Sequence, residues 1–273
     1  MTQFRLPAFL PLLCLACCAP QGSELSADLL AGLGGRDAST VVKLAIDDRD
    51  CSFDTRGLAE FKALETLSIT TCDSEFDYGP IRELAALQSL SIEDGKLEDL
   101  LFVFGLEALE SLTLDDTRVV QLAPLRSLTA LQELSLRNTP VVRLEPLSGL
   151  PALEALDVTE SYVLSLSALS GVSTLRVVRA GQTRIGSLAG LEALPALERV
   201  ELPGNGVADL GPLLANTSLA ATARERGVFV NLDRNCLSGT PEITAQMDRL
   251  RQTGVTLSAD AQSAECNRSY FGE

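Results

Sequence analysis

The chain has 273 residues and carries 37 acidic against 22 basic residues, which gives a formal net charge of −15. This acid excess provides no basic stripe to replace phosphate counterions, so the sequence excludes nucleic acid as a partner. The chain contains no histidine, which excludes Ser-His-Asp and Cys-His nucleophiles and removes the commonest zinc ligand. We therefore expect no metal, no cofactor and no enzymatic activity.

The N-terminal segment has the layout of an export signal, predicted to span residues 1–18. Arg5 is followed by a short apolar run from Leu6 to Leu15, and then by small residues and cysteines. The run is too short to cross a bilayer as a helix, and the order of the parts is that of a secretory signal peptide.

The end of this segment, LCLACC at 13–18, resembles a bacterial lipobox. The resemblance implies lipidation at Cys18, or alternatively at Cys17. An ordinary cleaved signal is the competing interpretation. We expect a protein exported to the cell envelope and lipid-anchored to a membrane, with a soluble secreted or periplasmic protein as the alternative.

Residues 19–37 are predicted to form a linker and an N-terminal cap. Leu25, Leu29, Leu30 and Leu33 have amphipathic helical spacing over 24–37. A terminal cap of this kind covers the exposed end of a repetitive core.

A 22-residue period dominates the rest of the chain. Its first apolar position falls at Leu84, Leu106, Leu128, Leu150, Val172 and Leu194, and the same apolar offsets recur inside each unit. In the unit from Leu128 these are Leu131, Leu134, Leu136, Val141, Leu144 and Leu147. Alternating apolar residues indicate a short strand, and a single coil of this length cannot bury its apolar face alone.

The pattern resembles the leucine-rich repeat, and its constant period resembles the internalin type, over residues 38–240. The resemblance implies an α/β-type repeat solenoid: a horseshoe with a parallel concave β-sheet, a convex side of 3₁₀ or irregular segments, and helical caps. In this family a ladder of asparagines bonds the backbone of adjacent turns. Here the ladder positions are Gly95, Thr117, Thr139, Ser161, Thr183 and Asn205. Hydroxyls can make part of that network, whereas Gly95 cannot, so its turn is expected either to be the weakest or to use a backbone or water substitute.

The C-terminal region is predicted to hold a helix near 217–226 on the convex side, a strand at 230–232, and a cap over 241–273. In the cap, Ile243, Met247 and Leu250 share one helical face, Thr240 is the expected N-cap and Gly254 the expected stop. Val255 and Leu257 are expected to add an edge strand. Asn216-Thr217-Ser218 is a formal glycosylation sequon, of little weight if the source is bacterial.

Four cysteines lie beyond the signal, an even number that fits two disulfides in an oxidising compartment. Three pairings are open. We favour Cys51–Cys72 and Cys236–Cys266, because each pair falls in one terminal region of the array. A metal site is the competing use, but these four cysteines contain no C-x-x-C spacing.

Residues between the inward leucines of each strand are expected to face the concave surface and to form the binding face. The charged members of this face are Glu93, Asp115, Glu133, Arg137, Asp157, Arg179, Arg199 and Glu201. The early units are acidic and the later ones carry the arginines, so we hypothesise a two-ended face that orients a partner of complementary charge. A solvated strand face must be polar in any case, and the face lacks the aromatic anchors of many interfaces.

These features favour a monomeric, non-catalytic protein-binding or adhesion module, with a protein as the partner. A structural envelope protein without a specific ligand is the first alternative. A carboxylate-dependent hydrolase is the second, and it would need a carboxylate pair with a raised pKa in a cleft. Glu93 and Asp115 lie on adjacent strands of an open face, where water would keep both ionised.

Overall fold

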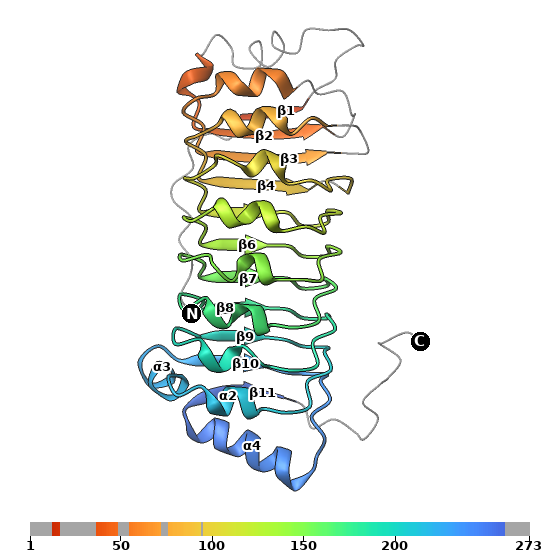
Figure 1. The fold of residues 1–273 in the computed structure, drawn as a ribbon, viewed down its shortest axis with the longest axis vertical. Coiled ribbons are helices and arrows are strands. Elements are labelled where there is room, and N and C mark those ends of the chain that lie inside the picture. The colour runs from red at the N-terminus through yellow and green to blue at the C-terminus, as the bar shows by residue number, and fades with distance from the viewer. Residues whose placement is uncertain (1–12, 17–36, 49–54, 72–75, 94, 260–273) are drawn as a thin grey trace.

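The structure is a computed structural model, and it describes residues 13–16, 37–48, 55–71, 76–93 and 95–259. In this part of the chain the strands form one parallel sheet of eleven, in which each strand pairs with its neighbours in sequence order. The coils therefore stack in a single direction, as Figure 1 shows. The strands are β1 (Leu13–Ala16), β2 (Lys43–Asp48), β3 (Thr66–Thr71), β4 (Ser89–Glu93), β5 (Ser111–Thr113), β6 (Glu133–Ser135), β7 (Ala155–Asp157), β8 (Val177–Arg179), β9 (Arg199–Glu201), β10 (Val228–Asn231) and β11 (Val255–Ser258).

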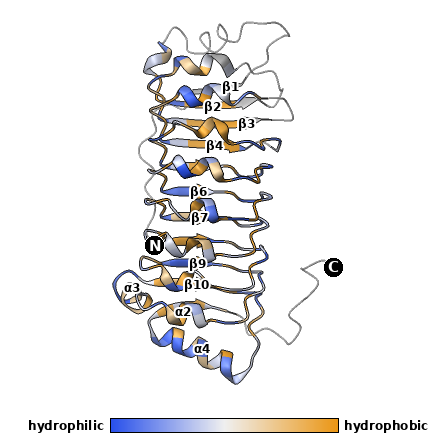
Figure 2. Cartoon of the chain, in the orientation of Figure 1, coloured by the Kyte–Doolittle hydropathy of each residue, from blue (hydrophilic) through white to orange (hydrophobic). Residues whose placement is uncertain are grey.

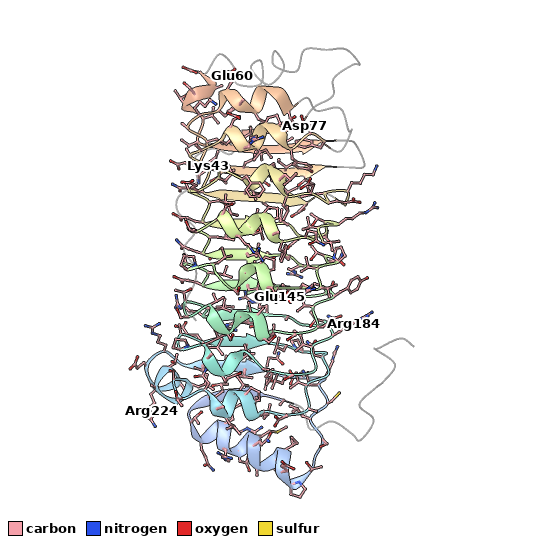
Figure 3. The ribbon with its side chains drawn as sticks, viewed as in Figure 1. Lys43, Glu60, Asp77, Glu145, Arg184 and Arg224 are labelled. Atoms are coloured by element: carbon pink, nitrogen blue, oxygen red, sulfur yellow. The ribbon has the colours of Figure 1, made fainter. Side chains whose placement is uncertain are left out.

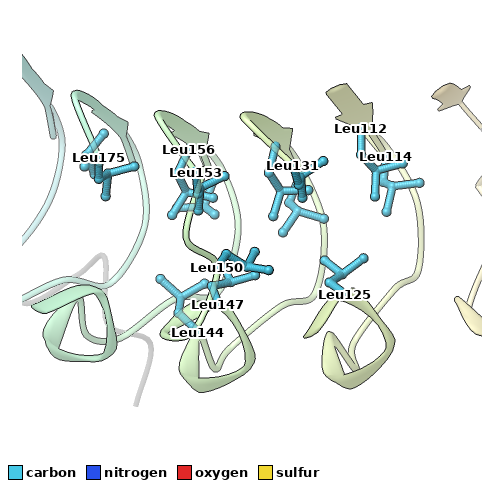
Figure 4. Close-up of a cluster of buried hydrophobic side chains, with 14 of the residues drawn as sticks. Leu112, Leu114, Leu125, Leu131, Leu144, Leu147, Leu150, Leu153, Leu156 and Leu175 are labelled. Carbon is cyan, nitrogen blue, oxygen red and sulfur yellow. The ribbon is translucent and has the colours of Figure 1, made fainter. Parts of the chain in front are cut away.

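The predicted core leucines lie inside the stack. Leu112, Leu134 and Leu156 occupy matched positions on β5, β6 and β7, and each is at most 2% exposed. Figure 4 shows the side chains of Leu112 and Leu156 pointing into the space between the sheet and the opposite wall of each coil. Because no coil can bury these side chains alone, the stacking itself creates the core. Along the coils, hydrophobic and hydrophilic residues alternate (Figure 2).

In each central coil, a residue with a left-handed backbone conformation follows the strand. Asp116, Asn138, Glu160 and Gln182 have φ between 50° and 62° and recur with the 22-residue period. Each donates its backbone N–H to the next coil; for example, Glu160 N lies 2.9 Å from Gly181 O. Non-glycine residues rarely adopt this conformation, so the repeated inter-coil bond is what holds it.

The wall opposite the sheet is built from 3₁₀ helices, as the short second half of each repeat predicted. Prolines occupy the second position of several of them, because proline is tolerated in the first turn of a helix; Pro124 and Pro146 are examples. The bounds are Ala38–Thr40, Thr55–Glu60, Gly79–Glu83, Leu101–Val103, Ala123–Ser127, Glu145–Leu147, Ser167–Gly171 and Leu191–Ala193.

The last regular coil is extended by two short helices. α2 (Gly211–Ala215) continues the row of 3₁₀ helices, contacting the one at Leu191–Ala193. α3 (Leu219–Glu225) forms where the sequence predicted a helix, but it lies beside the starts of β10 and β11 rather than on the convex side (Figure 1). The physical reason is that α2 already fills the convex position of this longer unit.

α4 (Pro241–Gln252) covers the C-terminal end of the core. Ile243, Met247 and Leu250 are buried, and the Thr240 hydroxyl accepts a hydrogen bond from Ile243 N at 3.4 Å. Gly254, with φ of 94°, turns the chain into β11. The sheet thus continues into the region predicted as a cap, and the expected edge strand is confirmed.

At the other end, β1 pairs with β2, although its residues belong to the predicted signal peptide. The signal peptide over residues 1–18 and the lipidation of Cys18, or of Cys17, stay predictions. The expected N-terminal cap helix over 24–37 lies outside the described residues except for Asp37, whose side chain accepts a hydrogen bond from Ser39 N. Within the described ranges, none of the helices has the length and apolar character needed to cross a membrane.

Candidate functional site

The sheet face, defined as the outward side of β4 to β11, carries a groove of about 1190 Å³. It runs from β5 to β11, and six of the eight charged residues predicted for the binding face line it: Asp115, Glu133, Arg137, Asp157, Arg179 and Arg199. Glu93 lies exposed on β4 outside the groove, and Glu201 lies between two arginines that line it. The period-22 spacing brings the six together because equivalent residues of stacked strands stand side by side.

The N-terminal half of the groove is acidic, and two of its carboxylates are held in place. Asp115 Oδ1 accepts hydrogen bonds from Ser135 Oγ at 2.6 Å and from Arg137 N at 2.9 Å. Asp157 Oδ1 accepts from Thr159 N at 3.0 Å. The two bonds to Asp115 link one coil to the next, while the bond to Asp157 lies within its own coil.

The arginines of the C-terminal half are paired inside the protein. Arg179 Nε lies 3.3 Å from Glu201 Oε2, and Arg199 Nη1 lies 2.8 Å from Glu201 Oε1. The Arg199 guanidinium also stands 5.2 Å from the centroid of the Phe229 ring. The predicted two-ended face is therefore modified: Arg179 and Arg199 share one glutamate, which offsets part of their positive charge.

A second ion network, which the sequence analysis did not include, crosses the starts of the strands. Arg176 bridges two coils, with Nη1 at 3.1 Å from Glu154 Oε2 and Nη2 at 2.9 Å from Glu198 Oε2. Arg226, which follows α3, adds a further bond to Glu198 Oε1 at 3.0 Å. All four residues line the groove.

The pairing of Arg176 with Glu198 favours the charged form of both side chains. Burial raises the pKa of Glu198, but hydrogen bonds from Arg176 and Arg226 outweigh it, so the pKa is lowered from its ordinary value. The hydrogen bond to Glu198 is the largest cause that raises the pKa of Arg176. Charge-assisted bonds of this kind set the geometry of side chains that would otherwise be mobile. The groove wall is thus organised before any partner arrives.

The sequence signal for Glu154, Arg176 and Glu198 is their own 22-residue spacing, one position before each strand. They were missed because only residues between the inward leucines were assigned to the face. Arg226 belongs to the longer unit that follows β9. Because the length of this unit departs from 22 residues, the period did not predict where Arg226 lies relative to the sheet. Phe229 lies opposite Arg199 on β10, which corrects the expectation that the face lacks an aromatic residue.

The polar ladder is buried and changes character along the solenoid. Thr117, Thr139 and Ser161 each donate a hydroxyl to the carbonyl three residues earlier, at 2.6–2.9 Å. Asn205 reaches further: its Nδ2 donates to Ala180 O of the preceding coil at 2.7 Å, and its Oδ1 accepts from Ile185 N at 3.0 Å. The hydroxyls of Thr117, Thr139 and Ser161 therefore support single coils, while the Asn205 amide also ties neighbouring coils. Gly95 is exposed, and the weakness of its turn stays a prediction.

Cys236 is disulfide-bonded. Its predicted partner Cys266, like Cys51, Cys72, Cys17 and Cys18, lies outside the described residues, so both pairings and the lipidation site stay predictions. Among the residues that the structure describes, no group of three His, Cys, Asp or Glu side chains could hold a metal ion.

The sequon at Asn216 has a structural use. Asn216 Nδ2 is buried and donates to Leu191 O at 2.8 Å and to Leu194 O at 2.9 Å. The amide nitrogen that glycosylation would modify is therefore enclosed by the coil in front of it.

The search for relatives by sequence found no matching family model and no matching curated protein. Structural likeness is clear. An internalin (inlF) from Listeria monocytogenes matches with a TM-score of 0.66 at 20% identity, covering 88% of this chain and 71% of that one. Internalin C2 of the same species matches with a TM-score of 0.62 at 23% identity, covering 71% and 89%.

A third match is a structure of the Toll–Spätzle complex from Drosophila, with a TM-score of 0.64 at 14% identity, covering 81% of this chain and 33% of that one. Together with the observed 22-residue coils, these likenesses define the class: the chain is a leucine-rich-repeat solenoid. The fold and the internalin-type resemblance expected from the repeat pattern are thus confirmed.

Proposed function

We propose that this protein is a non-catalytic protein-binding module exported to the cell envelope, which holds its partner on the sheet face. The observation that carries the proposal is the groove over β5 to β11, whose charged walls are positioned by inter-coil hydrogen bonds and ion pairs. Preorganised polar groups reduce the ordering that binding would otherwise require. A long open face of this kind suits a macromolecular surface better than a small molecule, which needs an enclosing cavity.

A protein partner also agrees with the fold. One of the matched structures is a complex of Toll with Spätzle, so a solenoid of this architecture binds a protein there. Fold alone does not define function, and the proposal for this chain rests on its own groove. We further propose that the module works as a monomer on its partner.

Export and anchoring form a separate part of the proposal. The order of Arg5, the apolar run and the small residues supports a signal over residues 1–18, with Cys18, or Cys17, as the lipidated residue. Intact-mass analysis of the mature N-terminus tests it. A mature chain that starts at either cysteine with added acyl mass is expected, and an unmodified, uncleaved N-terminus would contradict it.

The charge distribution makes a sharper experiment possible. Among the described residues Arg137 makes no salt bridge and is exposed, whereas Arg179 is paired with Glu201. Crosslinking mass spectrometry on cells that express the tagged protein identifies the partner. We then expect Arg137→Glu to weaken its binding more than Arg179→Glu, because only Arg137 offers its full charge to a partner. Arg249→Glu, on the exposed side of α4, is the matched control.

If Arg137→Glu and Arg249→Glu bind the partner equally well, the sheet face is not the binding surface. The alternatives have their own tests. Failure to recover any partner from envelope extracts favours a purely structural role. Turnover in a hydrolase screen, abolished by Asp115→Asn, favours the carboxylate enzyme.

A further inference from the structure

A line of exposed apolar side chains runs along one edge of the solenoid, away from the sheet face. Val120, Val142 and Leu164 occupy the same position in three successive coils, between the ladder residue and the 3₁₀ helix, and are 46%, 39% and 53% exposed. Tyr162, two residues before Leu164, is 53% exposed. We call these four residues the edge strip.

Backbone hydrogen bonds hold the edge segments of the Val142 and Leu164 coils in register with each other and with the following coil. Tyr162 N donates to Val141 O at 3.1 Å, and Arg184 N donates to Val163 O at 3.2 Å. The intervening valines, Val141 and Val163, are fully buried, so alternation forces their neighbours Val142 and Leu164 outward. Alternation does not require those outward residues to be apolar, and the matching positions could have been charged at no cost to the core.

Arginines flank the strip in a chain that is acidic overall. Arg118, Arg126, Arg143 and Arg184 are all exposed beside it. Arg143 is paired with Glu145 at 3.0 Å, while the Arg184 guanidinium stands 5.4 Å from the centroid of the Tyr162 ring. A cation over a tyrosine face keeps its outer N–H groups available to an acceptor. Figure 3 shows Arg184 projecting from this edge.

The strip also borders a hollow of about 350 Å³ lined by Val120, Ala123, Val142 and Pro146. Apolar patches rimmed by polar residues mark interaction sites more often than isolated exposed leucines do. Charge complementarity defines the kind of partner: apolar side chains for the strip and carboxylates for the arginines.

We propose that the edge strip is a second docking surface, which binds a segment of a partner protein that carries apolar side chains interspersed with aspartate or glutamate. The surface is independent of the sheet face, so the module can hold two proteins at once. Arg184 and Arg118 receive the carboxylates, and Val142 and Leu164 contact the apolar side chains.

The test places a photocrosslinking amino acid, p-benzoylphenylalanine, at Val142 or at Leu164 in the full chain, in cells that express it. The matched control carries it at Thr129, which is exposed on the opposite edge. We expect protein adducts at Val142 and Leu164 well above those at Thr129, with the crosslinked peptide containing both apolar and acidic residues. A synthetic copy of that peptide is then the binding probe.

We expect the double variant Arg118→Glu, Arg184→Glu to weaken binding of this peptide roughly tenfold, while Arg249→Glu and the sheet-face variant Arg137→Glu leave it unchanged. Circular dichroism of each variant confirms the fold. Adducts no stronger than at Thr129, adducts only with lipid or with a second copy of this chain, or unchanged affinity in the double variant would each overturn the proposal. None of these outcomes bears on the sheet face.

Discussion

Truncation of one buried leucine measures how much of the stability resides in the shared core. Leu156 on β7 is 0% exposed, and Leu156→Ala removes three carbon atoms. At about 0.8 kcal/mol per buried methylene, the transfer loss is about 2.4 kcal/mol. The cavity left behind adds to this loss because stacked coils above and below restrict collapse. We therefore expect a destabilisation of about 2–5 kcal/mol.

Leu164, eight residues later in the same coil, provides the matched control. It is 53% exposed, so Leu164→Ala should cost under about 0.5 kcal/mol, as for other surface substitutions. Urea unfolding followed by circular dichroism gives both values, and the slope of the transition shows whether the repeat array still unfolds as one unit. Equal losses for the two variants, or a loss under about 0.5 kcal/mol for Leu156→Ala, would refute the assigned register.

Three further experiments test other parts of the structure. Glu160→Gly should raise the melting temperature, because the left-handed φ of 62° costs a non-glycine residue about 1–2 kcal/mol; a lower melting temperature would show that the side chain stabilises the turn. Asn205→Ala should destabilise the protein more than Thr139→Ala does, since Asn205 bonds two coils and Thr139 one. Calorimetry of both variants measures the two losses of stability. Equal losses would contradict the difference between the amide and the hydroxyl. For Glu198, the folded-state pKa is lowered, so its stabilisation is present above the ordinary value of 4.5 and is lost as the pH falls through the folded value. Urea midpoints of Glu198→Gln should therefore fall less than those of the natural chain between pH 7 and pH 3; parallel curves would argue against the ion network.

The regular part of the fold was predictable because one physical requirement repeats every 22 residues. Leu134 and Leu156 must share an interior, and this requirement sets the strand, the direction of stacking and the outward direction of Glu133 and Asp157. The same logic predicted the α4 face, since Ile243 and Met247 recur at helical spacing.

The parts of the site that the sequence did not predict depend on contacts that the 22-residue period does not specify. The pairing of Arg179 and Arg199 with Glu201 follows from side-chain reach between coils, not from the pattern. Arg226 joins the groove only because α3 displaces the chain toward the strand starts, and Phe229 belongs to the same irregular unit. The positions of the arginines along the face therefore suggested a positive end, whose charge Glu201 partly offsets in the folded chain.

Carboxyl footprinting of the protein with and without its identified partner tests the sheet face directly. Glu133 and Asp157 line the groove, and Glu242 lies exposed at the start of α4. The proposed docking predicts that chemical labelling of Glu133 and Asp157 falls when the partner is added, while labelling of Glu242 stays constant. Unchanged labelling of both groove carboxylates in a saturated complex would show that the partner binds elsewhere.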